Sequence, residues 1–261
     1  MRILKKALPI WGAFFIAYHS SVFAQCGNAT LSEPVAIAYV YDGDTVKLAD
    51  GRRVRLIGLN AAEVGKDGRE SEPWADAATN RLKAILGEGA ARLSLGVQKQ
   101  DRYKRWLGHL YINGELLSER LLKEGVAYHI NIPPNSVFSE CLKAAELEAA
   151  EEKRGLWQTS PWRAVSSLKG SESGFRLLKG KVTALKSIRS GWILEIDDLL
   201  AVKISRVVGS SLLAVLDSPN LVGRTVAVRG WIRPKAVNAP AHYQPWFMVL
   251  THKVHLQPHF F

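Results

Sequence analysis

A run of small and polar residues at positions 159–174 divides this 261-residue chain into two units with different patterns. Serine, glycine and proline dominate the run, a composition that is typical of a linker and does not build a core. Before it, short strand-forming stretches alternate with helical ones, whereas after it the strand pattern predominates. The sequence therefore predicts domains at 25–158 and 175–261, joined by a linker at 159–174.

The pattern of the first unit indicates an α+β fold. Apolar residues at helical spacing lie between Pro73 and Gly87, which suit the first turn and the end of a helix. Asp50-Gly51 is a strong signal for a two-residue hairpin turn, and such a turn would make paired positions sum to 101. Two further helices are expected at 116–124 and 138–154, with strands at 35–41, 45–48, 53–59, 92–97 and 107–112.

The second unit reads as mainly β, with the spacing of a small β-barrel. Only residues 208–216 have a helical pattern there. We expect strands at 180–185, 192–196, 200–204, 225–231 and 246–250.

The first 24 residues have the pattern of a signal peptide. Arg2, Lys5 and Lys6 form a positive start, an apolar run follows at 7–18, and the stretch ends in Val22-Phe23-Ala24. A membrane anchor is disfavoured because the apolar run is short. A lipoprotein is disfavoured because it would need a small residue before Cys26, where this chain has Gln25. We expect cleavage after Ala24, export to the periplasm or medium, no stable membrane span after cleavage, and a monomer.

Cys26 and Cys141 are the two cysteines of the chain, and both lie in the expected mature protein. An oxidising compartment favours a disulfide between them. Two free thiols remain the alternative, because the sequence gives no distance between them.

Positive charge is concentrated in the second unit. The formal net charge is +11; residues 25–169 carry 20 Lys and Arg against 19 Asp and Glu, and residues 170–261 carry 12 against 5. A basic balance favours a polyanionic partner, although it also serves solubility.

Three segments of the first unit combine residues suited to phosphodiester chemistry: Asp42-Gly43-Asp44-Thr45, residues 55–63, and Asp101-Arg102-Tyr103-Lys104-Arg105. Carboxylate, amide and carbonyl oxygens suit calcium, and arginine matches phosphate geometry. The expected hairpin pairing makes Asp44 and Arg55 diagonal neighbours on one sheet face. The alternative is that these are solvated loop charges.

These segments, together with Lys153-Arg154-Gly155-Leu156-Trp157, resemble the staphylococcal-nuclease-like (thermonuclease) family over residues 35–157. The resemblance covers about half of the chain. It implies an OB-type five-stranded β-barrel with three helices, bound Ca²⁺, and DNA and RNA as substrates.

The resemblance also implies a role for each matching residue. Asp44, Asn60 and the Ala61 carbonyl would bind calcium, with Asp42 in support. Glu63 would act as general base on the attacking water. Phosphate would be held and its transition state stabilised by Arg55 and Arg105, and the nucleotide would contact Arg102 and Tyr103.

Two positions depart from the family pattern. Asn60 stands where the family usually has Asp, so one negative charge is missing and weaker calcium binding is expected. Lys104 stands where glycine is common, which questions the local turn. The sequence thus predicts an exported calcium-dependent nuclease; the alternatives are a catalytically weakened nucleic-acid-binding protein and a structural protein of the envelope.

In the second unit, residues 223–232 and 245–252 resemble small bacterial OB-fold domains of exported proteins. Several aromatic residues there are candidates to stack on bases beside basic residues, or else to fill the barrel core: Trp192, Trp231, Tyr243, Trp246 and Phe247.

Overall fold

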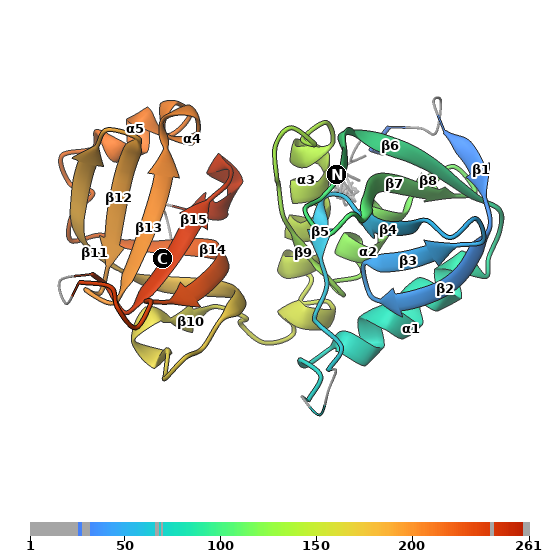
Figure 1. Ribbon diagram of the computed structural model, residues 1–261, viewed down its shortest axis with the longest axis horizontal. Helices are drawn as coiled ribbons and strands as arrows, with labels where there is room; N and C mark the ends of the chain where they lie inside the picture. Colours follow the sequence, from blue (N-terminus) through green and yellow to red (C-terminus); the bar gives the residue numbers. More distant parts are fainter. Residues whose placement is uncertain (1–25, 28–31, 66–67, 69, 241–242, 258–261) are drawn as a thin grey trace, which may run out of the picture.

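A half-barrel and a closed barrel, each with its own hydrophobic core, make up the computed structural model (Figure 1). The structure describes residues 26–27, 32–65, 68, 70–240 and 243–257. The expected signal peptide at 1–24 lies outside the described residues. Within the described ranges, every helix is too short or too polar to cross a bilayer.

The first domain is a curved, largely antiparallel sheet with three helices, as the sequence predicts. Its strands follow the order β1-β6-β7-β4-β3-β2, with β8 paired to β7 and a parallel contact between β4 and β7. The strands are β1 (Glu33–Val35), β2 (Ile37–Asp42), β3 (Thr45–Leu48), β4 (Arg53–Leu56), β6 (Ala91–Gln100), β7 (Trp106–Ile112) and β8 (Glu115–Leu116), and the short pair β5 (Leu59–Asn60) and β9 (Tyr128–His129) lies apart.

The three helices are α1 (Ala75–Leu86), α2 (Leu117–Lys123) and α3 (Ser139–Glu151), and a short 3-10 turn, η1 (Gly155–Trp157), follows them. The apolar stripe that predicts α1 is the face that the helix buries, through Ala78, Leu82 and Ile85. In Figure 1, α3, β5 and β9 form the side of this domain that is turned toward the second barrel.

The register of the β3–β4 hairpin differs by one residue from the expected pairing. Thr45 pairs with Arg55, and the Leu48 amide donates to the Arg52 carbonyl at 2.8 Å. The loop therefore contains three residues, and the expected two-residue turn is wrong. Gly51 has a φ of +92°, and a glycine in this left-handed region is what a three-residue hairpin loop uses at its last position.

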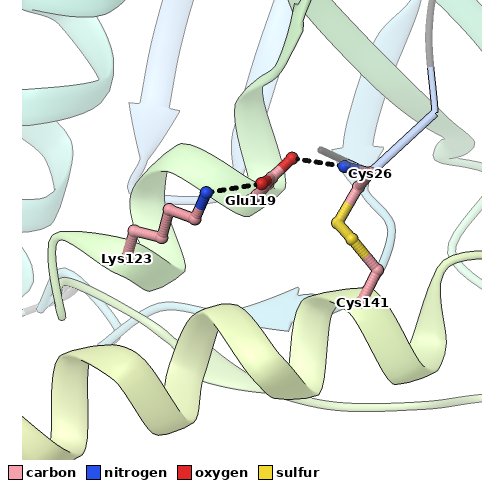
Figure 2. The surroundings of a disulfide bond; sticks show 4 residues. All are labelled: Cys26, Glu119, Lys123 and Cys141. Carbon is pink, nitrogen blue, oxygen red and sulfur yellow. Dashed lines mark hydrogen bonds and ion pairs between the residues drawn. A yellow bond between two sulfur atoms is a disulfide. The ribbon is translucent and has the colours of Figure 1, made fainter. Parts of the chain in front are cut away.

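Cys26 and Cys141 form a disulfide, so the predicted pairing is confirmed and two free thiols are excluded (Figure 2). The bond ties the start of the described chain to α3. The Cys26 amide also donates to the buried Glu119 carboxylate at 2.9 Å, and Lys123 Nζ lies 2.7 Å from the other oxygen of that carboxylate. A charged, hydrogen-bonded group therefore anchors the backbone beside the disulfide.

The second domain is a closed barrel of five strands. They follow the order β11-β12-β13-β15-β14, and pairing of β14 with β11 closes the ring. The strands are β11 (Gly174–Ile188), β12 (Gly191–Ile196), β13 (Leu200–Ser205), β14 (Thr225–Pro234) and β15 (Trp246–Leu250); β10 (Arg163–Ala164) and β16 (Leu256–Gln257) extend the edges, and η2 (Val165–Ser167), α4 (Arg206–Ser210), α5 (Leu213–Leu216) and η3 (Lys253–His255) complete the domain.

The segment that was expected to be a linker without a core belongs in part to this barrel. β10 pairs in parallel with β11, and Val165 and Leu168 are buried in the second core. Two apolar side chains among many serines are enough to fix the segment, which the overall composition did not reveal. The single helix expected at 208–216 is instead the two short helices α4 and α5.

A buried ion pair joins the two domains. Arg229 of β14 places Nη1 2.7 Å from both carboxylate oxygens of Glu146 in α3, and 3.2 Å from the His129 carbonyl. Close by, the Asn131 amide donates to His255 Nε2 at 2.9 Å. The side chains of Arg229 and Glu146 are 4% and 3% exposed. Each domain therefore buries one charged side chain whose counter-charge comes from the other domain.

Candidate active site

A cavity of about 1020 Å³ lies between the two barrels. From the first domain it is lined by Arg55, Asn60, Glu63 and the loop that joins β6 to β7. From the second domain it is lined by residues of β14 and β15. The cavity therefore brings together the second and third of the segments that the sequence singled out, and it adds a wall from the second domain.

Asp44 and Arg55 form a buried ion pair at the base of this site. Asp44 Oδ2 lies 2.9 Å from Arg55 Nη2 and accepts a hydrogen bond from the Ala61 amide at 3.0 Å. Thr45 Oγ1 donates to Asp44 Oδ1 at 2.9 Å. The expected proximity of Asp44 and Arg55 is present although the hairpin register is different, and Asp44 lies in the turn directly before β3.

Hydrogen bonds within the protein fix the guanidinium of Arg55. Its Nη1 donates to the carbonyls of Leu56 at 3.0 Å and Leu59 at 2.9 Å, and its Nη2 donates to Asn60 Oδ1 at 3.0 Å. With the Asp44 ion pair, these contacts engage both terminal nitrogens of the guanidinium. The Nε–H is the donor for which the described residues show no acceptor, and it remains for a ligand in the cavity that Arg55 lines.

Gly43 lets this region pack closely. A Cβ placed on Gly43 would lie 2.6 Å from the Cβ of Ala78 and 2.7 Å from that of Ala61, closer than carbon atoms approach in folded proteins. A glycine between Asp42 and Asp44 therefore allows the β2–β3 turn to contact both α1 and the chain segment after β5.

Burial raises the pKa of Asp44 to about 7. Loss of hydration is the largest cause; the neighbouring Asp42 adds to it, whereas Arg55 and the Ala61 amide oppose it. Asp42 is also buried, and its Oδ1 accepts from the Asp44 amide at 3.2 Å. Two carboxylates thus lie together with one guanidinium, an arrangement in which a cation would stabilise the charged form of Asp44.

The groups around Asp44 supply oxygen donors of the type that calcium prefers. They are the Asp44 carboxylate, the Asn60 amide oxygen and the Ala61 carbonyl, and the last two lie on adjacent residues at the end of β5. Asn60 Nδ2 is 3.3 Å from the Ala61 carbonyl oxygen. The donor set is of the chemical type that a hard divalent cation binds, and Asp44 Oδ2 and Asn60 Oδ1 both also contact Arg55 Nη2.

Glu63 follows this segment and is exposed to the cavity. Its backbone is fixed by reciprocal bonds with Glu72: the Glu63 amide donates to Glu72 Oε2 at 3.0 Å, and the Glu72 amide donates to the Glu63 carbonyl at 2.9 Å. Glu72 also lies 3.2 Å from Arg176 of the second domain. The position of Glu63 is therefore fixed from both domains while its side chain faces solvent.

Asp101 organises the loop that carries Arg105. Its Oδ1 accepts from the amides of Tyr103 at 2.8 Å and Arg105 at 3.0 Å, and its Oδ2 accepts from Arg105 Nε at 2.8 Å. The pKa of Asp101 is lowered, because these bonds together outweigh its partial burial, which alone would raise it. The described residues show no acceptor on Nη1 or Nη2 of Arg105, so these groups remain for a ligand.

Lys104 occupies the left-handed region, with a φ of +63°. A lysine therefore makes a turn here in a backbone region that favours glycine, at a modest cost in backbone strain. Beside it, Arg102 lies over the ring of Tyr103 at 4.7 Å and donates to its hydroxyl at 2.5 Å. Tyr103 is largely exposed and lines the cavity.

The structure separates the aromatic residues of the second domain into two groups. Trp231 and Phe247 line the cavity, whereas Trp246 is buried in the core and Trp192 packs against it. Tyr243 is exposed and does not line the cavity. Arg233, which sequence reasoning did not single out, lies beside Phe247 as its cross-strand partner; its only signal was its alternation with core residues in β14.

Comparison with known proteins matches residues 53–159 to the family described as staphylococcal nuclease homologue. The thermonuclease of Staphylococcus intermedius is 30% identical over 139 residues, which are 52% of this chain and 83% of that protein. The thermonuclease of Staphylococcus hyicus is also 30% identical, over 53% and 84% of the two chains. Endonuclease YncB of Bacillus subtilis is 29% identical, over 54% and 67%.

Proposed function

The chain belongs to the staphylococcal nuclease family, and we propose that it is an exported nuclease that hydrolyses DNA and RNA with calcium as its cofactor. The observation that carries the proposal is that Arg55, Glu63 and Arg105 line one cavity directly beside the buried Asp44. Hydrolysis of a phosphodiester needs these three kinds of group: donors for the phosphate oxygens, a base for water, and a cation site.

In this proposal Asp44, Asn60 and the Ala61 carbonyl hold calcium, with Asp42 in support. Bound calcium supplies positive charge that polarises the phosphate and favours attack by water. The position of Asn60 is fixed from the guanidinium of Arg55, so the amide oxygen is already turned toward the ion pair.

Glu63 acts as the general base. It accepts a proton from the attacking water as the new bond to phosphorus forms, and the bond to the leaving oxygen then breaks and that oxygen takes a proton from solvent. Arg105 offers Nη1 and Nη2 to the phosphate oxygens as their charge grows, and Arg55 offers Nε. Arg102 and Tyr103 contact the nucleotide at the same end of the cavity.

Export is part of the proposal. The disulfide between Cys26 and Cys141 supports an oxidising location, which is the periplasm or the medium. The pattern of the first 24 residues supports the same location.

The test is hydrolysis by the purified protein. Plasmid DNA and a long RNA are incubated with calcium, with magnesium, and with a chelator, and the products are separated on gels. We expect cleavage of both substrates with calcium and none in the chelator. Glu63→Gln should lower the rate by about 10²–10⁴-fold, the usual effect of removing a general base. Glu115→Gln, an exposed carboxylate outside the cavity, is the matched control and should cleave like the parent.

A nucleic-acid-binding protein with a weakened centre is the second candidate. Two observations favour it: Asn60 takes the place of a carboxylate, and both terminal nitrogens of Arg55 are engaged within the protein. Tight binding of DNA or RNA without cleavage, at any calcium concentration up to several millimolar, would select this candidate and reject the nuclease.

A further inference from the structure

We propose that Trp231, Arg233 and Phe247 of the second barrel form a subsite for one unpaired nucleobase and its phosphate. The inference rests on the proposed function, because it extends the same cavity. It assigns the second domain a part in holding the substrate strand whose phosphate lies at the arginines of the first domain.

The alternation of β14 and β15 places these side chains outside the barrel. Ile232, Met248 and Leu250 point into the core and are buried. Trp231 and Phe247 alternate with these core residues; each is 36% exposed, and both line the cavity. Two large, partly exposed rings that line one cavity form an apolar patch of the kind that marks a binding site.

Arg233 and Phe247 are directly opposite each other in the β14–β15 ladder. Side chains in this relation lie close enough to act on one ligand. A ring and a guanidinium side by side suit a nucleotide, since the ring stacks on the base and the guanidinium pairs with the phosphate.

Trp231 is held in place by a row of aromatic rings that crosses the domain boundary. Its ring lies 5.1 Å from that of Phe175, edge to face, and Phe175 lies 6.1 Å from Tyr128 of the first domain. Tyr128 is the strand partner of Asn60 in the β5–β9 pair. Trp231 therefore has a defined position relative to the candidate calcium ligands, so a base stacked on it would be placed relative to the reacting phosphate.

The charge of the cavity favours a nucleotide over an apolar peptide. Five arginines line it against two carboxylates, and these charges are Arg53, Arg55, Arg102, Arg105, Arg233, Glu63 and Asp101. An excess of guanidinium groups around exposed aromatic rings matches a ligand with flat apolar faces and repeated negative charge. A base inside a duplex has both faces covered, so the subsite takes an unpaired base.

The test compares two fluorescent single strands of equal length, one with all its bases and one with abasic sites. Affinities are measured by fluorescence anisotropy in a chelator, and a gel verifies that the strands stay intact. We expect the parent protein to prefer the base-bearing strand by roughly 5- to 100-fold. Phe247→Ala should remove most of this preference, and Arg233→Gln should weaken binding of both strands.

Trp231→Leu is a second variant with the same expected loss of preference. Because Trp231 packs against Phe175, the folding of the Trp231→Leu variant is checked by circular dichroism. If that variant does not fold, Phe247→Ala alone tests the subsite. Tyr39→Ala, an exposed aromatic outside the cavity, is the matched control and should keep the preference.

Two results separate this inference from the proposed function. A base preference that survives in both Phe247→Ala and Trp231→Leu overturns the subsite, even if the protein cleaves DNA. Loss of the preference in these variants, in a protein that cleaves no nucleic acid with calcium, upholds the subsite and overturns the nuclease.

Discussion

Arg55 and Arg105 are both arginines of the candidate site, but the protein holds them in different ways. Arg55 is buried, and its terminal nitrogens bond to Asp44, Asn60 and two backbone carbonyls. Arg105 is half-buried and bonds to Asp101 through Nε. Arg55 therefore contributes to the stability of the fold as well as to the candidate site, whereas Arg105 contributes mainly to the site.

This difference predicts a large loss of stability for one and little change for the other of two substitutions that should both abolish cleavage. Arg55→Ala leaves the buried Asp44 without its cation and should lower the free energy of unfolding by about 3–5 kcal/mol. Arg105→Ala should change it by less than about 1 kcal/mol, because its ion pair is partly solvated. Urea unfolding measures the first quantity and oligonucleotide cleavage the second. Equal stability of the two variants would contradict the structural role of Arg55.

Asn60 gives a prediction about metal affinity. Asn60→Asp adds a negative charge at the end of β5, where the Ala61 carbonyl and Asp44 already offer oxygens, so calcium binding should tighten. A tenfold or greater decrease in the dissociation constant, measured by calorimetry, is the expected result. Asn135→Asp, which lines the same cavity away from Asp44, is the control. An unchanged constant in Asn60→Asp would remove Asn60 from the proposed ligand set.

At the scale of the elements, the contact between α3 and β14 decides how the barrels are joined. Glu146 and Arg229 are buried there and bond to each other at 2.7 Å. Glu146→Gln leaves an unpaired guanidinium in the interface and should cost about 3–5 kcal/mol of stability. The double variant Glu146→Leu with Arg229→Met should cost much less, because no charge stays buried.

Urea unfolding followed by tryptophan fluorescence compares the two variants of this contact. If the double variant is at least as unstable as Glu146→Gln, the attraction between the two charges stabilises the contact between the domains. Removal of the unpaired buried charge would then not have restored stability. Arg120→Gln, which removes a partly exposed pair with Glu88, is a control for the loss of an ordinary ion pair.

The elements were largely predictable from the sequence, because most of them follow from local patterns. As expected, α1 ends directly before Gly87, α2 and its capping residue Glu124 end directly before Gly125, and the Asn113-Gly114 turn has positive φ at both residues. The hairpin register was not predictable, since Asp50-Gly51 fits a two-residue and a three-residue loop equally well. The register depends on which residue adopts the left-handed region, and this is set by the packing of the whole sheet.

The candidate site was predictable to the extent that its segments carry recognisable residue types. The sequence did not show that the second barrel forms one wall of the cavity, because no local sequence pattern indicates that β14 packs against α3. One signal was present: Glu146 lies among Leu142, Ala145 and Ala149 on the buried stripe of α3. A carboxylate in such a stripe indicates a buried cationic partner, although not which one.

At the scale of the whole molecule, pH acts on the interface through buried imidazoles. The pKa of His255 is lowered to about 3, chiefly by burial and in addition by the neighbouring Arg229, His129 and His252. In the folded protein its Nε2 accepts from the Asn131 amide, so the ring stays neutral. The unfolded chain takes up this proton below pH 6.5, so the contribution of His255 is complete above pH 6.5 and is lost as the pH falls toward 3.

We expect the pH dependence of stability to differ between the parent and His255→Gln. Glutamine still offers a hydrogen-bond acceptor but does not titrate. Relative to this variant, the parent should lose about 2 kcal/mol of stability between pH 7 and pH 5. The comparison cancels the opposite effect of Asp44, whose raised pKa makes the folded state bind a proton in the same range. Thermal unfolding at several pH values measures the difference, and parallel pH profiles would exclude His255 as its source.

The disulfide has a mechanical consequence for the chain. Cys26 and Cys141 are 115 positions apart, so the bond encloses almost the whole first barrel between two covalently joined points. Tension applied between the two ends of the protein therefore bypasses this loop and acts on the chain after Cys141. Roughly 40 nm of contour length, at about 3.5 Å per residue, stays locked until the bond is reduced. The barrel that carries the candidate catalytic residues is shielded from pulling, while the barrel behind it is not.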